Sequence, residues 1–283
     1  MIGVDIGGTN LLIGIIEDGK VIDRLHQPIV ARSDFEAVAL QTSDAIVALA
    51  GDNVSCVGIS VAGSVDAGRG IVLRAQNLDW DNVPLAERIA SHLGCTVVIE
   101  NDVTSAAWGE YTYGAGRGSD SIFAVWIGTG IGGGLILDGK IWRGPLGTGG
   151  EFGMGISESN SNAPVRTLEG LASRSGLQHL VELPELDTSK IIAEYSRDGA
   201  IKNAIDEGAQ RIGTSIANAV TLLSLDKVVL GGGIVEALGE PYIQSIRKQF
   251  LNDVFPTHCR KCELCMTELG PDAGLLGAAS LIK

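Results

Sequence analysis

The chain has 283 residues, a formal net charge of −13 at pH 7 and a hydrophobic content of 45%. This hydrophobic content suffices for a core that needs neither disulfides nor a metal, and the length suits one large domain or two ordinary ones. The acidic balance argues against nucleic acid or an anionic membrane as the main partner, because both require a basic surface, but it permits a nucleotide held by a local group of N–H donors.

The first residues, Met1-Ile2-Gly3-Val4, enter a strand directly, without the basic and apolar segments of a leader peptide. No stretch of eighteen apolar residues occurs. The five cysteines, an odd number, fit a reducing compartment better than a disulfide framework. We therefore expect a cytoplasmic protein.

The first hundred residues alternate strands with helices after an opening meander. Ser33 and Glu36 form a capping-box pair at the start of the first helix, and Gly51 ends it. This alternation predicts a mixed, largely parallel sheet covered by helices. The predicted elements are a hairpin over 4–16, strands over 20–26, 54–61 and 96–100, helices over 33–51 and 84–94, and an irregular segment over 64–82.

The second half repeats this scheme with insertions, which suggests an internal repeat with a hinge near 108–118. Its predicted elements are a hairpin over 121–137, a strand over 140–142, a loop over 144–167, short helices over 168–181 and 188–196, a long helix over 202–224, a strand over 227–230, a helix from Pro241, a strand over 262–269 and a helix of small residues over 274–282.

Two glycine-rich hairpins stand out, one in each half. Each consists of a strand, a tip of glycine and threonine, and a second strand. Glycine lets backbone N–H groups approach an anion closely, and a threonine hydroxyl adds a donor. One such hairpin alone is as well explained as an ordinary turn, but two related hairpins predict a polyphosphate held in a cleft. The tip residues concerned are Gly7, Gly8, Thr9 and Asn10 in the first hairpin, and Gly128, Thr129, Gly130, Gly132 and Gly133 in the second.

Asp5 lies beside the first tip, where a carboxylate next to a phosphate makes sense only with a cation between them. We therefore predict that Asp5 anchors Mg²⁺ through water. Gly231, Gly232 and Gly233 follow an apolar strand, at the strand end where ligands bind in α/β sheets. They would let a purine and its ribose lie against backbone, although a loose turn is nearly as good an interpretation.

Asn101 and Asp102 end a strand and begin a helix. A plain N-cap explains them structurally. The functional alternative makes Asp102 a general base that takes the proton of a substrate hydroxyl, with Asn101 orienting a sugar. Glu151 and Glu169 are either solvated surface residues or carboxylate acceptors for vicinal sugar hydroxyls.

His258, Cys259, Cys262 and Cys265 have a spacing that would suit a metal site. We do not assign one, because the stretch 262–269 reads as a strand, in which residues i and i+3 face opposite sides. Whether these residues bind any metal stays open. Cys56 and Cys95 are predicted to be core residues.

Taken in this order, the motifs resemble the ROK family of sugar kinases, within the actin-like, hexokinase-type (ribonuclease H-like) ATPase superfold. The resemblance spans nearly the whole chain, and it implies an α/β fold of two lobes with duplicated mixed-sheet domains that close over a sugar. The small lobe would comprise 1–110 and a C-terminal helix over about 273–283, and the large lobe 111–272. The motifs that carry the resemblance are Asp5 to Asn10, Gly63 with Asn77-Leu78, Glu100-Asn101-Asp102, Ile127 to Gly134, Gly150-Glu151-Phe152-Gly153, Leu168-Glu169 with Ala172-Ser173, Gly231 to Gly233, and Asp272 to Ala279.

The resemblance implies an ATP- and Mg²⁺-dependent phosphorylation of a hexose hydroxyl, at C6 of glucose or a near relative. The alternative substrate is an N-acetylhexosamine, such as N-acetylmannosamine or N-acetylglucosamine. The two glycine hairpins would hold the phosphates, Gly231 to Gly233 would back the adenosine, and Asp102 would be the base. The residues implied to face the sugar are Gly63, Asn77, Asn101, Asp102, Glu151 and Glu169.

The chain departs from the family pattern after Gly150-Glu151. The position usually held by a histidine is Met154, and 155–167 contains no cysteine. The resemblance therefore implies that the structural zinc of the family and one sugar contact are missing here, which leaves open the identity of the sugar and what orders the loop. Cys259, Cys262 and Cys265 do not match the zinc-loop position.

Two rival functions follow from the same resemblance. A sugar-sensing repressor needs a DNA-binding extension before the first hairpin, whereas Met1 lies four residues from Asp5 and the charge is strongly negative. A non-catalytic sugar-binding regulator would have no need of Asp102. We thus expect a sugar and ATP as partners, neither nucleic acid nor a membrane, and a homodimer.

Overall fold

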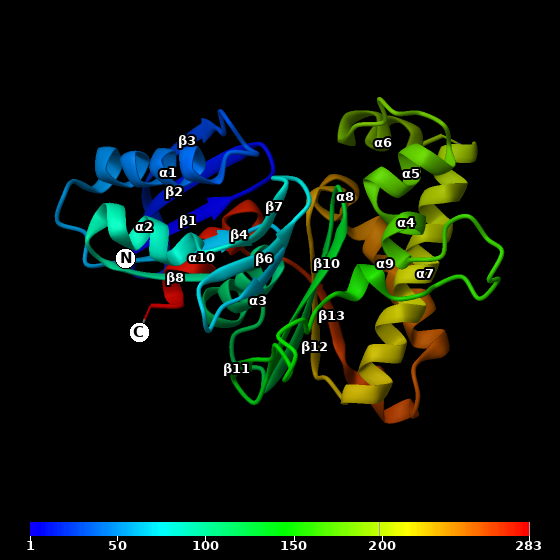
Figure 1. The fold of residues 1–283 in the computed structure, drawn as a ribbon. Helices are drawn as coiled ribbons and strands as arrows, with labels where there is room; N and C mark the ends of the chain where they lie inside the picture. The colour runs from blue at the N-terminus through cyan, green and yellow to red at the C-terminus, as the bar shows by residue number, and fades with distance from the viewer. Residues whose placement is uncertain (198, 283) are drawn as a thin grey trace. The chain divides into compact units, whose positions relative to one another are not determined.

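The computed structural model describes residues 1–197 and 199–282, so that Lys283, the last residue of the predicted small lobe, lies outside the described residues. The chain divides into two compact units (Figure 1). Unit 1 comprises Met1–Arg117, Ile141–Gly149 and Pro271–Lys283, and unit 2 comprises Gly118–Lys140 and Gly150–Gly270. Within the described residues, no helix is both long and apolar enough to span a lipid bilayer.

Unit 1 is built on a mixed five-stranded sheet in the order β3-β2-β1-β4-β8. β1 pairs antiparallel with β2 and parallel with β4, and β4 pairs parallel with β8. The elements of this unit are β1 (Ile2–Ile6), β2 (Asn10–Glu17), β3 (Lys20–Pro28), α1 (Phe35–Ala50), β4 (Cys56–Val61), α2 (Leu85–Leu93), β8 (Thr96–Asn101), α3 (Asp102–Tyr113) and α10 (Ala273–Ser280).

The two faces of this sheet bury different kinds of residue, because side chains alternate along a strand. Branched residues of one face pack against α1 and α2; Val4, Ile59 and Ile46 are fully buried there. The opposite face carries Gly3 and Gly58 in register. A Cβ on Gly58 would lie 1.8 Å from the Ala278 carbonyl oxygen, so α10 rests directly on the backbone of β1 and β4.

The segment over 64–82, predicted to be irregular, instead contains most of a small antiparallel sheet, and that prediction is wrong. The sheet consists of β5 (Ser64–Asp66), β6 (Ile71–Ala75) and β7 (Trp80–Val83). Its strands have three to five residues and its register shifts between Ser64 and Val65. A strand this short shows no period in the sequence.

The predicted cap of α1 is also wrong by one residue. Asp34, rather than Ser33, caps the helix and accepts a hydrogen bond from the Ala37 N–H over 3.1 Å. Asp34 lies three residues before Ala37, the spacing that an N-cap side chain requires. Cys56 and Cys95, predicted to be core residues, are only partly buried.

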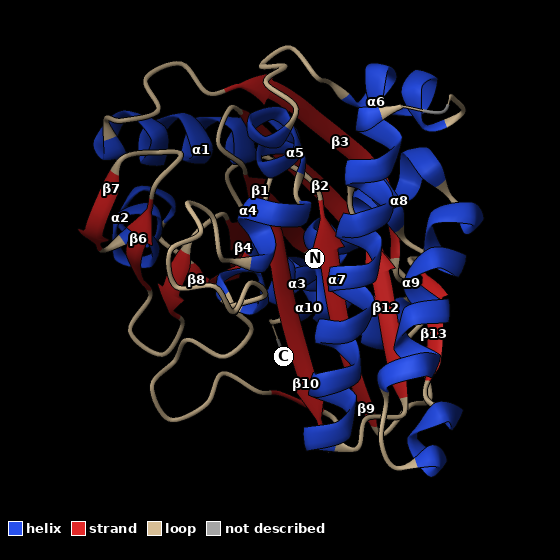
Figure 2. Ribbon diagram, turned by 90° about the vertical axis from the view of Figure 1, so that its right-hand side faces the viewer, coloured by secondary structure: helices blue, strands red, loops and turns tan. Residues whose placement is uncertain are grey.

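Unit 2 repeats the sheet of unit 1, in the order β11-β10-β9-β12-β13, with β9 antiparallel to β10 and parallel to β12. This correspondence confirms the predicted duplication of mixed sheets. Figure 2 shows β9, β10, β12 and β13 together with the helices of this unit. Its elements are β9 (Ser121–Ile127), β10 (Ile131–Leu137), β11 (Lys140–Ile141), α4 (Leu168–Ala172), α5 (Arg174–Leu180), α6 (Thr188–Tyr195), α7 (Ala200–Leu223), β12 (Lys227–Gly231), α8 (Gly233–Leu238), α9 (Glu240–Asp253), β13 (Glu263–Met266) and 3₁₀ turns at Phe152–Met154 and Thr257–Lys261.

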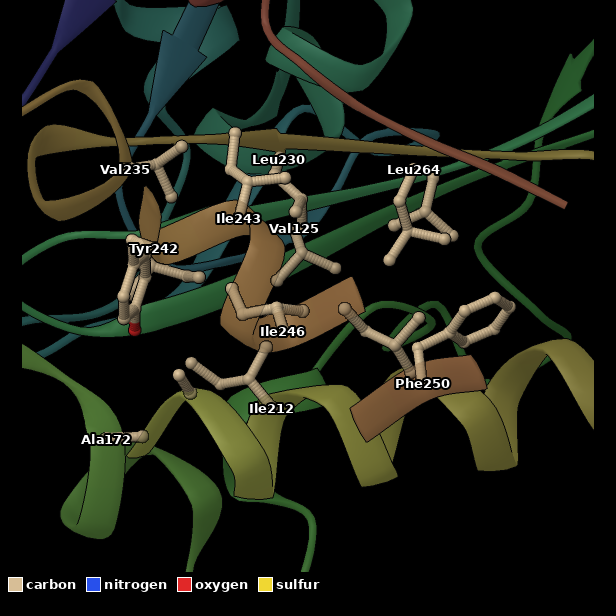
Figure 3. Close-up of a cluster of buried hydrophobic side chains, with 14 of the residues drawn as sticks. Val125, Ala172, Ile212, Leu230, Val235, Tyr242, Ile243, Ile246, Phe250 and Leu264 are labelled. Carbon is tan, nitrogen blue, oxygen red and sulfur yellow. The ribbon is translucent and has the colours of Figure 1, made fainter. Parts of the chain in front are cut away.

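The core of unit 2 forms where α9 packs between α7 and the sheet. Figure 3 shows Ile246 of α9 between Ile212 of α7 and Val125 of the sheet, and Phe250 of α9 belongs to the same cluster. All four side chains are fully buried. The predicted helix over 202–224 is thus confirmed to within two residues, because its apolar period was read correctly. The predicted strand over 262–269 is shorter, because Thr257–Lys261 forms a 3₁₀ turn before it and pairing with β12 ends at Met266.

Candidate active site

In unit 1, four acidic or amide residues gather because parallel strands end at the same edge of the sheet. Asp5 of β1 is in register with Ser60 of β4, which is in register with Glu100 of β8. The Ser60 hydroxyl donates a hydrogen bond of 2.7 Å to Asp5 Oδ1. Asn101 and Asp102 follow Glu100 directly, so the strand order carries them to the same edge.

Asn101 serves as both helix cap and side-chain support. Its Oδ1 accepts a hydrogen bond of 2.9 Å from the Thr104 N–H and so caps α3. Its Nδ2 donates to the Gly63 carbonyl over 3.0 Å and to Asp102 Oδ1 over 2.8 Å. The structural explanation of Asn101 is thus confirmed, and the same side chain fixes the Asp102 carboxylate.

The pKa of Asp102 is raised to about 7, chiefly by burial and then by the negative charge of Asp5. Hydrogen bonds from the Val103 N–H, from its own backbone and from Asn101 oppose this rise in part. Burial likewise raises the pKa of Asp5, although the bond from Ser60 lowers it. Because burial and the charge of Asp5 destabilise the Asp102 anion, Asp102 is partly protonated near neutral pH, which suits proton transfer.

Glu100 and Arg143 form a buried contact that the sequence did not reveal. Only 3% of the Glu100 side chain is exposed. Glu100 Oε2 accepts from Arg143 Nε over 2.7 Å and pairs with Arg143 Nη2, and Glu100 Oε1 accepts from the Asn101 N–H over 3.0 Å. The segment over 141–149 is thereby tied to the turn that carries Asn101 and Asp102.

The first hairpin tip packs against the loop that contains Asn77. A Cβ on Gly8 would lie 2.9 Å from Asn77 Cβ, and the Gly7 N–H closes the tip on the Asn10 carbonyl over 2.9 Å. Thr9 and Asn10 are exposed. Gly63 has φ 129°, and a Cβ there would lie 2.4 Å from the Arg74 carbonyl oxygen, so only glycine fits this turn.

In unit 2, the second hairpin tip is bracketed by α4 and α5. The Ile131 N–H donates 2.8 Å to Glu169 Oε2, and the Arg174 N–H donates 2.9 Å to the Gly128 carbonyl. The tip consists of Gly128, Thr129 and Gly130. Gly132 and Gly133, predicted as part of the phosphate site, lie inside β10 opposite Trp126 and Val125.

The loop of Gly231 to Gly233 lies flat against β9. A Cβ on Gly231 would lie 2.7 Å from the Trp126 ring, and Gly232 has φ 90° with the Ile127 backbone 2.7 Å from its Cβ position. The Gly233 nitrogen lies 3.9 Å from the Cβ position of Gly128. The two glycine loops of this unit are therefore neighbours, as a nucleotide spanning base and phosphates would require. Gly233 opens α8, an element that the sequence analysis missed because it has only six residues.

The loop after Glu151 is ordered by backbone pairing and arginine contacts. Ile156 bridges to Thr167, and the Leu168 N–H donates 2.9 Å to the Gly155 carbonyl. Arg211 of α7 donates to the Ser157 carbonyl over 3.1 Å and pairs with Glu158 at 3.5 Å. Glu151 is exposed, and Met154 is 49% exposed.

Within the described residues, no group of three or more His, Cys, Asp or Glu side chains is arranged to hold a metal ion. Cys262 is buried, and its pKa is raised to about 12 by burial and by neighbouring acids and thiols. A thiol with so high a pKa is a poor metal ligand and a poor nucleophile.

The whole chain, residues 1–283, matches the model of the ROK family. A glucokinase of Thermotoga maritima is 32% identical over all of this chain and 97% of its own length. Among solved structures, a ROK family glucokinase from Streptomyces griseus in complex with glucose and AMPPNP has 31% identity and a TM-score of 0.83, over 99% of this chain and 98% of that one. A putative N-acetylmannosamine kinase from Listeria monocytogenes has 27% identity and a TM-score of 0.84, over 99% and 97%.

Proposed function

Because this chain belongs to the ROK family, we propose that it is a sugar kinase that transfers the γ-phosphoryl group of ATP to a hexose hydroxyl, at C6 of glucose or a near relative. The glucokinases among its relatives support this activity. The observation that carries the proposal within the molecule is the Asp102 carboxylate, which is oriented by Asn101 and has a pKa of about 7.

Asp102 acts as the general base. It accepts the proton of the sugar hydroxyl while that oxygen forms a bond to the γ-phosphorus and the bond from this phosphorus to the β–γ bridging oxygen breaks, so that ADP leaves. A base with a pKa near the working pH is half ionised and still basic enough to assist. The burial that raises its pKa therefore serves the reaction.

Unit 2 binds the nucleotide in this proposal. The tip of Gly128 to Gly130 takes the phosphates, and Gly231 to Gly233 take the adenosine; the short distance between the two loops supports this assignment. The first hairpin tip of unit 1, Gly7 to Asn10, stays a predicted phosphate-binding turn.

Mg²⁺ fits the donor set around Asp5. Asp5 has a partly buried carboxylate near the carboxylate of Asp102. Among the described residues, the Ser60 hydroxyl is the one group that donates a hydrogen bond to the Asp5 carboxylate. One or two carboxylates are what Mg²⁺ uses in phosphoryl-transfer sites, where it keeps several waters. Asp5 would hold the ion through water, and the bound ion would neutralise charge on the phosphates.

Hydrogen-bonding groups recognise the sugar in this proposal. In unit 1 they are the side chains of Asn101 and Asn77 and the backbone at Gly63, whereas Glu151 and Glu169 stay predictions from the family resemblance. An N-acetylhexosamine is the second candidate substrate, because Met154 takes the place of a histidine in the family pattern and the putative N-acetylmannosamine kinase has the same fold.

The test is a coupled ADP-release assay with Mg-ATP across hexoses and N-acetylhexosamines, run with Asp102→Asn and, as a matched control, with Asp44→Asn on the exposed face of α1. We expect sugar-dependent ADP release that Asp102→Asn reduces by at least about 100-fold and that Asp44→Asn leaves unchanged. Thermal stabilisation by sugars without any sugar-dependent ADP release would overturn the proposal in favour of a regulator.

A further inference from the structure

In the described part of the chain, the carbonyl groups of the second hairpin tip accept hydrogen bonds, and two of its N–H groups are bonded to no acceptor. The carbonyls of Gly128, Thr129 and Gly130 accept from the N–H groups of Arg174 (2.9 Å), Ser175 (3.2 Å) and Gly128 (2.9 Å), respectively. Within the part of the chain that the structure describes, no acceptor is bonded to the N–H groups of Thr129 and Gly130. A loop whose N–H groups are available and whose carbonyl groups are already bonded favours the binding of an anion.

Arg174 adds a positive charge to this tip. It is the first residue of α5, and its Nη2 donates a hydrogen bond to Thr129 Oγ1. Because the hydroxyl oxygen of Thr129 accepts this bond, its own hydrogen remains available to another acceptor. The guanidinium group has five N–H donors, of which this contact uses one.

The backbone before and after Arg174 is fixed by tight packing. The Ser173 hydroxyl, buried at the junction of α4 and α5, accepts from the Gly176 N–H over 3.0 Å. A Cβ on Gly176 would lie 2.5 Å from the Gly170 carbonyl oxygen, so α5 starts directly against the backbone of α4. The backbone that carries the Arg174 side chain is therefore held rigidly.

Among the residues that the structure describes, no carboxylate neutralises the charge of Arg174. Within the described residues, no Asp or Glu oxygen lies within ion-pair distance of its guanidinium group, whereas Arg197 and Arg247 of the same unit pair with Glu194 and Glu240. Glu169 also touches the tip, but its Oε2 is bonded to the Ile131 N–H. An unpaired arginine beside free N–H donors is the arrangement that proteins use to bind phosphate groups.

We propose that Arg174 binds the terminal phosphates of the nucleotide, together with the Thr129 hydroxyl and the N–H groups of Thr129 and Gly130. This inference rests on the proposed function, because it assigns a residue to the nucleotide of that reaction. A nucleotide, rather than a free anion, is the ligand class, because the Gly233 nitrogen lies 3.9 Å from the Cβ position of Gly128 and places the adenosine loop beside the tip. Neither hairpin motif includes Arg174, so the motifs alone do not predict this role.

The test compares nucleotide binding by calorimetry in the wild-type chain, Arg174→Gln and Arg174→Lys, with AMPPNP and AMP as probes at fixed salt. Arg197→Gln is the control, because it removes an equal charge from an exposed, paired arginine of the same unit. We expect Arg174→Gln to weaken AMPPNP binding by about 10- to 100-fold and to leave AMP binding unchanged within about twofold. Arg174→Lys should fall between them, and Arg197→Gln should match the wild type.

A double variant separates direct binding from mere support of Thr129. If Arg174 binds phosphate itself, Thr129→Val with Arg174→Gln binds AMPPNP more weakly than Thr129→Val alone. Equal binding by these two variants would overturn the proposal, as would wild-type affinity in Arg174→Gln.

The outcomes also separate this inference from the proposed function. A wild-type chain that binds AMPPNP through Arg174 but releases no ADP with any sugar would sustain the inference and refute the kinase. Sugar-dependent turnover in the wild-type chain together with unchanged AMPPNP binding in Arg174→Gln would sustain the kinase and refute the inference about Arg174. A wild-type chain that does not bind AMPPNP at all would refute both.

Discussion

Replacement of Asp102 by asparagine should stabilise the fold while it slows turnover by at least about 100-fold. Asparagine has the same shape as aspartate, and its Oδ1 can still accept the 2.8 Å hydrogen bond from Asn101. The pKa of Asp102 is about 7 against a reference of 3.8. At about 1.4 kcal/mol for each pKa unit, the ionised carboxylate costs the folded state up to about 4 kcal/mol at high pH. Because Asp102 is partly exposed, screening by solvent reduces the expected gain to about 1–3 kcal/mol.

The sign of the pH dependence follows from where the proton binds. Since the pKa is raised in the folded state, the folded protein between pH 3.8 and about 7 holds a proton that the unfolded chain releases. The free energy of unfolding of the wild type therefore falls as pH rises through this window, and the full cost is present above about pH 7. The advantage of the asparagine variant is greatest at about pH 8 and falls to less than half at about pH 5.

The assay is urea unfolding of the wild type, Asp102→Asn and Asp44→Asn at both pH values, with melting temperatures alongside. For a chain of this size we expect Asp102→Asn to raise the melting temperature at pH 8 by roughly 3–10 °C, and Asp44→Asn to have no pH-dependent effect. An Asp102→Asn variant that is no more stable than the wild type at pH 8, or whose advantage does not change with pH, would refute the reasoning about burial and charge.

Three further predictions concern other positions. In Asp5→Asn the negative charge that raises the pKa of Asp102 is gone, so the acid limb of the kcat/KM profile should move to lower pH; an unmoved limb would show that the two carboxylates do not interact. Gly232 has φ 90°, and its Cβ position lies 2.7 Å from the Ile127 backbone. Gly232→Ala should therefore cost about 1–3 kcal/mol of stability in denaturant unfolding and weaken AMPPNP binding. Gly233 has open space at its Cβ position, so Gly233→Ala should leave the stability unchanged. Arg143→Met leaves the buried Glu100 carboxylate without its positive partner and should cost about 2 kcal/mol of stability, and kcat should fall by a larger factor than KM changes. Adding Glu100→Gln to Arg143→Met should restore most of the stability. A double variant that is no more stable than Arg143→Met would contradict the charge argument.

The repetitive features of the fold were predictable from the sequence because they follow from local periodicity. The helix over 202–224 was predictable because its apolar residues keep one period over many residues. The hairpin over 121–137 was predictable because two apolar runs flank a turn of glycine and threonine. The small sheet over 64–83 was missed because three short strands with a register shift leave no such period. The helix at Gly233–Leu238 was missed for the same reason.

The candidate site divides in the same way. Asp5, Asn101 and Asp102 were predictable because they stand at strand ends, where topology alone brings side chains together. Arg143 and Arg174 were not, because their importance depends on contacts with Glu100 and Thr129, which are 43 and 45 residues distant in the sequence. Such contacts leave no local pattern.

The close seating of α10 on β1 and β4 has a consequence for the order in which the protein is made. A ribosome releases the whole of unit 2 before it releases Ala273–Ser280, the helix that covers Gly3 and Gly58. β1 and β4 therefore have one face uncovered until α10 has been made, whereas unit 2, which lies between these strands and α10 in the sequence, can already fold. These two strands are translated before unit 2 but completed after it.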